Sequence, residues 1–280
     1  MSRNEAFTPW RCPLCGGALQ GENDLKCEKG HCFDRAREGY WHLLPVQSMR
    51  TKAPGDSKEM VAARRAFLNA GYYGIFGQAL GELCLAHGVP AAKDAPLHLL
   101  DAGCGEGWYD RCIAQQFAAA EKPLQLAGFD IAKPAVRLAA KALPTAQYAV
   151  ASSFSQPVRT GWADLLLNCF SPFAQEEFLR VLRPGGSLLI ANLNSFSTAG
   201  DWTAEGKAAS GFLIDNYLDS RAEWESWNGI LIRNWHRPFH LYMQALLKNG
   251  LRLAHVALHG ELPRAHARRS AGCGPRNSPC

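Results

Sequence analysis

The chain has 280 residues, of which 47% are hydrophobic and 20% charged, and its formal net charge is +5 at pH 7. This length suits one large α/β domain with a small additional module. The chain lacks a run of eighteen apolar residues, and Met1–Glu5 lacks a signal-peptide core, so we expect a cytoplasmic protein without a membrane partner. Without the four arginines of residues 264–280, 26 basic residues face 25 acidic ones, so charge alone supports nucleic-acid binding only weakly.

The first motif along the chain is a cluster of potential metal ligands. Cys12, Cys15, Cys27 and His31 have the spacing C-x2-C-x11-C-x3-H, which suits a tetrahedral Zn²⁺ site. Ten cysteines in a cytoplasmic chain indicate metal ligands and buried thiols rather than disulfides. Cys32 leaves a second possibility open, a site with the spacing C-x2-C-x11-C-x4-C. Adjacent residues rarely bind the same ion, so either His31 or Cys32 is the fourth ligand.

A helical segment follows this cluster. The pattern predicts a helix over residues 58–70, with Arg64 and Arg65 in its middle. These two side chains either form a solvated basic face or contact phosphate or guanine. Tyr72 and Tyr73 come next, and their rings either stack on a base or pack in the core.

The most informative segment is an apolar run that ends in an acid and a glycine-rich loop. Residues 97–100 predict a buried strand, and Asp101, Gly103, Gly105 and Gly107 follow it. Glycine at every second position lets the backbone approach a ligand where a Cβ would collide. The spacing differs from the G-x-G-x-x-G of a dinucleotide site, and the acid would repel a pyrophosphate.

A second apolar run, residues 124–129, ends in Asp130 about one βα unit later, where a carboxylate can accept the two hydroxyls of a ribose. Together these motifs resemble the class I S-adenosylmethionine (SAM) methyltransferases, whose first motif is an acid followed by Gly-x-Gly-x-Gly. The resemblance implies SAM as the cofactor. Asp101 would attract its sulfonium or amino group, the three glycines of the loop would surround it, and Asp130 would hold its ribose.

The rest of the body alternates strands and helices, which predicts an α/β, doubly wound, Rossmann-like sheet. The expected strands are residues 97–100, 124–129, 146–151, 163–169 and 187–192, and the expected helices are 108–120, 133–143 and 175–182. Ligands of such sheets bind at the carboxyl ends of the strands. Ser152 lies at one of these ends, and the resemblance places it near the adenine ring. Its hydroxyl either bonds adenine or caps a loop.

A denser resemblance covers residues 12–186. The segments in question are Gly30–Asp34, Glu38–Tyr40, Leu43–Gln47, Pro54–Ser57 and Arg64–Tyr73. In order and spacing they are similar to the bacterial 23S rRNA (guanine-N1) methyltransferases, which begin with a zinc ribbon. This resemblance favours His31 over Cys32 as the fourth ligand. It implies methyl transfer from SAM to N1 of a guanine in a 23S rRNA hairpin loop, with a homodimer as a further possibility.

The expected target site is Asn168-Cys169-Phe170-Ser171-Pro172, after the fourth strand. Guanine N1 is a weak acid and must lose a proton, yet no residue here is an obvious general base. We expect Asn168 and the backbone around Ser171 and Pro172 to orient the base, with proximity and desolvation supplying most of the acceleration. Cys169 is interpreted as a packing residue.

Residues 190–262 resemble a different group, the class I methyltransferases of small molecules. The matching segments are Ile190–Phe196, Ile214–Leu218, Asn234–Pro238 and Tyr242–Leu247. Trp224, Trp227 and Trp235 with His236 either line a pocket for a flat substrate or anchor the core. Two alternatives therefore remain open: a methyltransferase of a small molecule, and a non-catalytic, zinc-dependent RNA-binding protein.

The expected organisation has four parts. A zinc-ribbon module occupies residues 1–50, linker helices occupy 51–95, and the SAM-dependent methyltransferase domain occupies 96–263. The tail, residues 264–280, is rich in Arg, Gly, Pro and Ser and is expected to be disordered.

Overall fold

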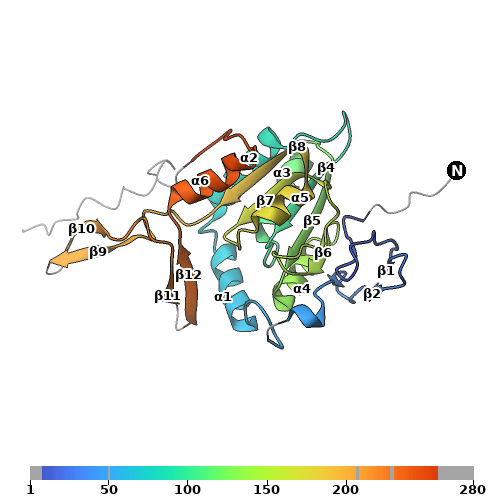
Figure 1. The fold of residues 1–280 in the computed structure, drawn as a ribbon, viewed down its shortest axis with the longest axis horizontal. Coiled ribbons are helices and arrows are strands. Elements are labelled where there is room, and N and C mark those ends of the chain that lie inside the picture. The colour runs from blue at the N-terminus through green and yellow to red at the C-terminus, as the bar shows by residue number, and fades with distance from the viewer. Residues whose placement is uncertain (1–7, 50, 206–207, 228–229, 258–280) are drawn as a thin grey trace, which may run out of the picture. The chain divides into compact units, whose positions relative to one another are not determined.

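The computed structural model describes residues 8–49, 51–205, 208–227 and 230–257 (Figure 1). The predicted disordered tail lies outside these residues. The chain divides into two compact units. The first contains the residues up to Leu193 together with Ser226–Ile232, and the second contains Asn194–Glu225 and the residues from Arg233 onward. Among the described residues, no helix has the length and apolar character needed to cross a membrane.

A six-stranded parallel sheet forms the centre of the first unit, in the order β3-β6-β5-β4-β7-β8 (Figure 1). Five of its strands are β4 (Leu97–Ala102), β5 (Leu124–Asp130), β6 (Gln147–Val150), β7 (Ala163–Cys169) and β8 (Leu182–Ala191). They correspond to the five predicted strands. Their nearly unbroken apolar runs are typical of strands that are covered on both faces. The α/β fold class is therefore confirmed.

Helices cover one face of this sheet. They are α2 (Gly74–His87), α3 (Trp108–Ala119) and α4 (Lys133–Ala142), whose buried side chains share one core cluster with the sheet. Helix α1 (Lys58–Asn69) precedes them and begins at Ser57, whose hydroxyl accepts a hydrogen bond from the Met60 N–H. Val61 of α1 packs against Ala132 and Ala135 at the start of α4. Helix α1 thus lies at the carboxyl ends of strands β5 and β4.

The opposite face is covered by α5 (Gln175–Val181) and by the N-terminal ribbon. The ribbon contains the hairpin of β1 (Asp24–Lys26) and β2 (Cys32–Asp34). Trp10 is fully buried in the same cluster as Val158 and Phe178, and the Arg159 guanidinium donates to the carbonyls of Trp10 and Leu19. The ribbon therefore completes the hydrophobic core on this face.

Two features of the sheet were not predicted. The short strand β3 (Trp41–His42) follows the ribbon and pairs parallel with β6, which makes the N-terminal segment the edge of the sheet. A single 3-10 turn, η1 (Val46–Ser48), comes after it. Strand β8 begins at Leu182 rather than 187, with an irregular register opposite β7 that accommodates the Pro184-Gly185-Gly186 turn.

The second unit has no part in this sheet. It contains the antiparallel hairpin of β9 (Gly200–Glu205) and β10 (Ala208–Ile214). Strands β11 (Arg221–Trp227) and β12 (Ile230–His236) form a separate two-stranded sheet, of which Ser226–Ile232 belongs to the first unit. Helix α6 (Phe239–Lys248) starts directly after Pro238, as expected from the fixed φ of proline at a helix start.

Trp10→Ala tests whether ribbon and sheet share one core. We expect the free energy of unfolding to fall by about 3–5 kcal/mol, because a fully buried tryptophan is removed from a cluster that both parts build. Urea denaturation followed by circular dichroism measures this loss. Phe154→Ala, at a ring that is 70% exposed, is the control and should change the value by less than about 0.5 kcal/mol. Equal effects of the two substitutions would contradict the shared core.

Candidate functional site

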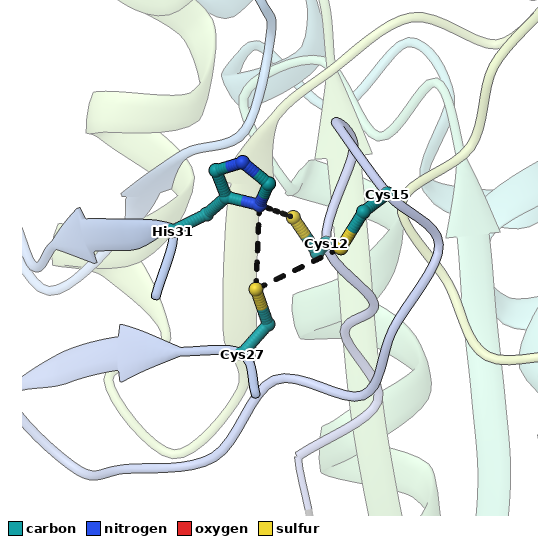
Figure 2. Close-up of side chains that lie close together, drawn as sticks. All are labelled: Cys12, Cys15, Cys27 and His31. Carbon is teal, nitrogen blue, oxygen red and sulfur yellow. Dashed lines mark hydrogen bonds between the residues drawn. The ribbon is translucent and has the colours of Figure 1, made fainter. Parts of the chain in front are cut away.

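Four side chains of the ribbon converge on one point (Figure 2). His31 Nδ1 lies 3.5 Å from Cys12 Sγ and 3.4 Å from Cys27 Sγ, and the Sγ atoms of Cys15 and Cys27 are 3.7 Å apart. With typical Zn–S and Zn–N bond lengths, a tetrahedron has S···S edges of about 3.8 Å and S···N edges of about 3.6 Å. The donor set and its spacing therefore fit a Zn²⁺ ion.

The two loops that carry these ligands are tight turns. Gly16 and Gly30 both have a left-handed φ, of 73° and 81°, and their N–H groups donate to the carbonyls of Cys12 and Cys27. Such turns favour glycine because a Cβ is strained at positive φ. They bend the chain so that the ligands of each loop point to the same ion.

Cys32 lies apart from this cluster. It is exposed on β2, beside Asp24 and Asp34. His31 precedes β2 and lies with the three cysteines, whereas Cys32, the first residue of the strand, lies with the two aspartates. The geometry thus favours His31 as the fourth ligand. None of the described cysteines forms a disulfide.

The glycine loop between β4 and α3 has three residues with left-handed φ, namely Gly103 at 98°, Gly105 at 55° and Gly107 at 71°. A Cβ on Gly103 would lie 2.3 Å from the Ser171 Cβ, and a Cβ on Gly107 would lie 3.0 Å from the Ala139 Cβ. A Cβ on Gly105 would meet nothing within 4 Å. Only Gly105 therefore borders open space, whereas the other two glycines make room for the protein's own side chains.

Asp130 connects the tip of β5 to this loop. Its carboxylate accepts hydrogen bonds from the Gly105 N–H at 2.9 Å and from the Ala132 N–H at 2.8 Å. Burial raises the pKa of Asp130, although both N–H groups act in the opposite direction. Beside it lies a small hollow that opens to solvent. The residues that line this hollow are Asp56, Val61, Arg64, Gly105, Glu106, Asp130, Ala132 and Ala135.

Asp101 is the most unusual carboxyl group of the site. It is 1% exposed, and neither oxygen receives an N–H or a hydroxyl proton from any described residue. Burial and the neighbouring Asp110 raise its pKa well above the usual range. Asp110 accepts the Tyr148 hydroxyl at 2.9 Å. Buried acceptors without donors fit a ligand that brings a positive charge.

The three predicted target residues do come together at the tip of β7. The buried amide Nδ2 of Asn168 donates to the Ala102 and Pro172 carbonyls, at 3.2 and 3.4 Å, and to Ser171 Oγ. The Ser171 hydroxyl donates to the same Ala102 carbonyl. The Asn168 N–H groups are thus used to fix the loop to β4. Next to them Phe170 has a left-handed φ of 50° and is 40% exposed.

Ser152 and Cys169 have contacts that bear on their expected roles. Ser152 Oγ accepts a hydrogen bond from the Phe154 N–H at 3.2 Å, which is the loop-capping contact. Cys169 is 6% exposed in the core beneath the sheet, and burial raises the pKa of its thiol well above the usual range. A protonated, buried thiol is inert, in agreement with a packing role.

Sequence reasoning missed a buried ion-pair network. Glu106 is 3% exposed, and its carboxylate lies 3.2 Å from Arg65 of α1 and 3.3 Å from Arg111 of α3. Arg64 pairs with Asp56 at 2.8 Å. The two central arginines of α1 therefore pair with acids near the hollow. The sequence signal for this network is Glu106 between two glycines of the loop. A carboxylate that is buried in a loop needs a cationic partner, so an arginine near Glu106 could have been predicted.

In the second unit, His236 is buried and both ring nitrogens have partners, Thr198 Oγ1 and the Tyr217 carbonyl, each at 2.8 Å. This arrangement is that of a core histidine. Trp224 and Trp235 are 62% and 45% exposed, and the side chain of Trp227 lies outside the described part of the structure.

Zinc content distinguishes the two candidate fourth ligands. We expect about one equivalent of Zn²⁺ in the purified protein, strongly reduced occupancy in His31→Ala, and unchanged occupancy in Cys32→Ser. Elemental analysis of the freshly purified variants measures this. Loss of zinc in Cys32→Ser with retention in His31→Ala would contradict the assignment.

Arg65→Ala tests the ion pair between α1 and the glycine loop. We expect a loss of about 1–2 kcal/mol in the free energy of unfolding, because a buried carboxylate keeps only one of its two cations and Arg65 is 38% exposed. Urea denaturation gives the value. The control is Arg137→Ala, which breaks a pair whose cation is 54% exposed and should cost less than about 0.5 kcal/mol. Equal losses of unfolding free energy in the two variants would contradict a stabilising role for the Arg65–Glu106 pair.

Comparison with known proteins bears on both parts of the site. Residues 10–52 match the family model described as "RlmA, N-terminal", a zinc ribbon, and residues 100–190 match a methyltransferase domain. A structure of a "putative S-adenosylmethionine dependent methyltransferase" from Listeria monocytogenes is similar with a TM-score of 0.51 and 22% identity, over 62% of this chain and 81% of that one. This likeness shows the class I methyltransferase fold.

Two curated relatives are similar to the chain in sequence. The chain is 40% identical to the "23S rRNA (guanine(748)-N(1))-methyltransferase" of Streptomyces fradiae, over 64% of this chain and 61% of that protein. It is 38% identical to the "Putative 23S rRNA (guanine-N(1)-)-methyltransferase" of Micromonospora griseorubida, over 64% of each. The aligned part thus spans less than two thirds of each relative. These findings confirm the predicted resemblance: the chain combines an RlmA-type zinc ribbon with a methyltransferase domain and is similar to the 23S rRNA (guanine-N1) methyltransferases.

Proposed function

We propose that this protein transfers a methyl group from SAM to N1 of a guanine in 23S rRNA. The observation that carries the proposal is the pair of acids at neighbouring strand tips, Asp101 and Asp130, on either side of a glycine loop. The similarity to rRNA methyltransferases, together with the match of residues 10–52 to the RlmA zinc ribbon, supports RNA as the substrate class.

The cofactor site is assigned to the first unit. Asp130 retains lone pairs on both oxygens after its two backbone contacts, so it can accept the ribose hydroxyls in the adjoining hollow. Asp101 and Asp110 together supply the negative charge that attracts the amino or sulfonium group. Gly105 leaves room for the ligand, Gly103 and Gly107 keep the loop in shape, and Ser152 lies on the loop beside the adenine. When bound, SAM supplies an electrophilic methyl group.

The target base is assigned to the tip of β7. Asn168, Ser171 and Pro172 hold the loop rigidly against β4, which fixes the direction in which the backbone carbonyls point. These carbonyls and the Phe170 ring orient the guanine edge. No side chain of the loop is positioned to take the N1 proton, so rate acceleration comes from alignment and loss of water, and the proton passes to solvent.

The other parts of the chain have roles in the same proposed reaction. The ribbon of residues 1–50 contacts RNA, the helices of 51–95 frame the site, and 96–263 form the methyltransferase domain. The RNA presents the guanine in a hairpin loop, where its Watson–Crick edge is accessible. The protein works in the cytoplasm, where ribosomal RNA is made available, and a homodimer is compatible with this role.

Incubation of the zinc-loaded full chain with labelled SAM and 23S rRNA transcripts tests the function. We expect label in RNA, and a primer-extension stop at one guanine, because methylation at N1 blocks the pairing edge. SAM binding without labelled RNA would contradict the proposal in favour of a small-molecule methyltransferase. RNA binding without SAM binding would contradict it in favour of a non-catalytic RNA-binding protein.

The affinity for SAM should depend on pH through the carboxyl pair. Burial raises the pKa of Asp110 to about 6, while Asp101 keeps its proton to higher pH. The pair carries one negative charge above about pH 6 and none below it, so affinity for a cation falls as the pH drops. Calorimetry should show binding weakened up to about tenfold between pH 6 and pH 5. Asp110→Asn should flatten this dependence, and an unchanged slope in that variant would contradict the role of the pair.

A further inference from the structure

Five aromatic rings form a continuous row near the proposed target site, here called the aromatic row. Its members are Phe67, Tyr72, Tyr73, Phe76 and Phe170. Tyr72 stacks on Phe67 with centroids 4.9 Å apart, and Phe67 meets Tyr73 at 5.5 Å. Tyr73 meets Phe170 at 6.2 Å. The row therefore connects the end of α1 to the tip of β7 within the first unit.

Tyr72 is the exposed end of the row. Its side chain lies in the turn between α1 and α2 and is 73% exposed, while one face of the ring is nearly parallel to Phe67, at 21°. The turn is held by hydrogen bonds from the Gly71 N–H to the Leu68 carbonyl and from the Gly74 N–H to the Gly71 carbonyl. A fixed, flat ring with one face on the protein presents its other face to a planar ligand.

Phe170 is the inner end of the row. It adopts a left-handed φ of 50°, which a bulky residue rarely does, and it is still 40% exposed. It precedes Ser171, whose hydroxyl donates to the Ala102 carbonyl at the tip of β4. The row thus leads from the surface to the strand tips where the methyl group would be transferred.

We propose that Tyr72 stacks on a base of the RNA loop other than the target guanine, and so positions the loop while the target lies at Phe170. This inference rests on the proposed function. A single-stranded loop exposes unstacked bases, and aromatic side chains are their usual partners. The alternative is that a protein, rather than an RNA base, binds to the exposed end of the aromatic row.

The test uses the zinc-loaded full chain and a hairpin transcript in which the wild-type enzyme methylates a mapped guanine. Tyr72→Ala should raise KM for this transcript about 5- to 150-fold with a smaller change in kcat, the range that loss of one stacked base produces. Tyr72→Phe should stay within about twofold of wild type, and Tyr72→Leu should behave like Tyr72→Ala because it keeps apolar area but has no ring. Calorimetry should show unchanged SAM binding in all three variants. Val89→Ala, at an exposed side chain beyond the far end of α2, is the matched control.

The outcomes separate the inference from the proposed function. If wild type labels no transcript, the proposed function fails. If wild type is active and Tyr72→Ala or Tyr72→Leu matches the control, stacking by Tyr72 is overturned. A defect that occurs with assembled ribosomal particles but not with the naked transcript would also overturn it, because it would assign the row to a protein partner.

Discussion

The bond between the Asp130 carboxylate and the Gly105 N–H is the contact on which the site depends. It joins the tip of β5 to the loop after β4, and the second oxygen of the same carboxylate fixes the start of α4 through the Ala132 N–H. Two adjacent strands and two helices are thereby held around one hollow. An acid at this position is therefore needed for the shape of the loop as well as for any contact with a ribose.

The buried acids around the glycine loop differ in how their charge is compensated. Glu106 pairs with Arg65 and Arg111, whereas burial and the neighbouring Asp110 raise the pKa of Asp101 well above the usual range. An incoming positive charge is therefore stabilised at Asp101 and Asp110 rather than at Glu106. This contrast explains why two acids only a few residues apart in sequence have different roles.

Much of this arrangement was predictable because parallel strands and glycine loops have strong local signals. Four of the five strands from residue 97 onward were predicted to within two residues at each end, while the fifth starts at Leu182 rather than 187. The spacing identifies Cys12, Cys15 and Cys27 as zinc ligands and leaves His31 and Cys32 as alternatives for the fourth. The long-range contacts were not predictable. The edge strand Trp41–His42 has only two residues and depends on pairing with β6. The partners of Arg65 and Asp101 depend on how α1 and α3 pack, which no pattern of spacing reveals.

Calorimetric titration of SAM into the zinc-loaded full chain tests the central claim most directly. The account predicts binding by wild type, and at least about tenfold weaker binding by Asp130→Ala, with Asp130→Asn in between because an amide keeps one acceptor oxygen. Glu38→Gln, in the turn between β2 and β3, should bind as wild type does. Absence of SAM binding by wild type, or equal binding by Asp130→Ala, would contradict the account.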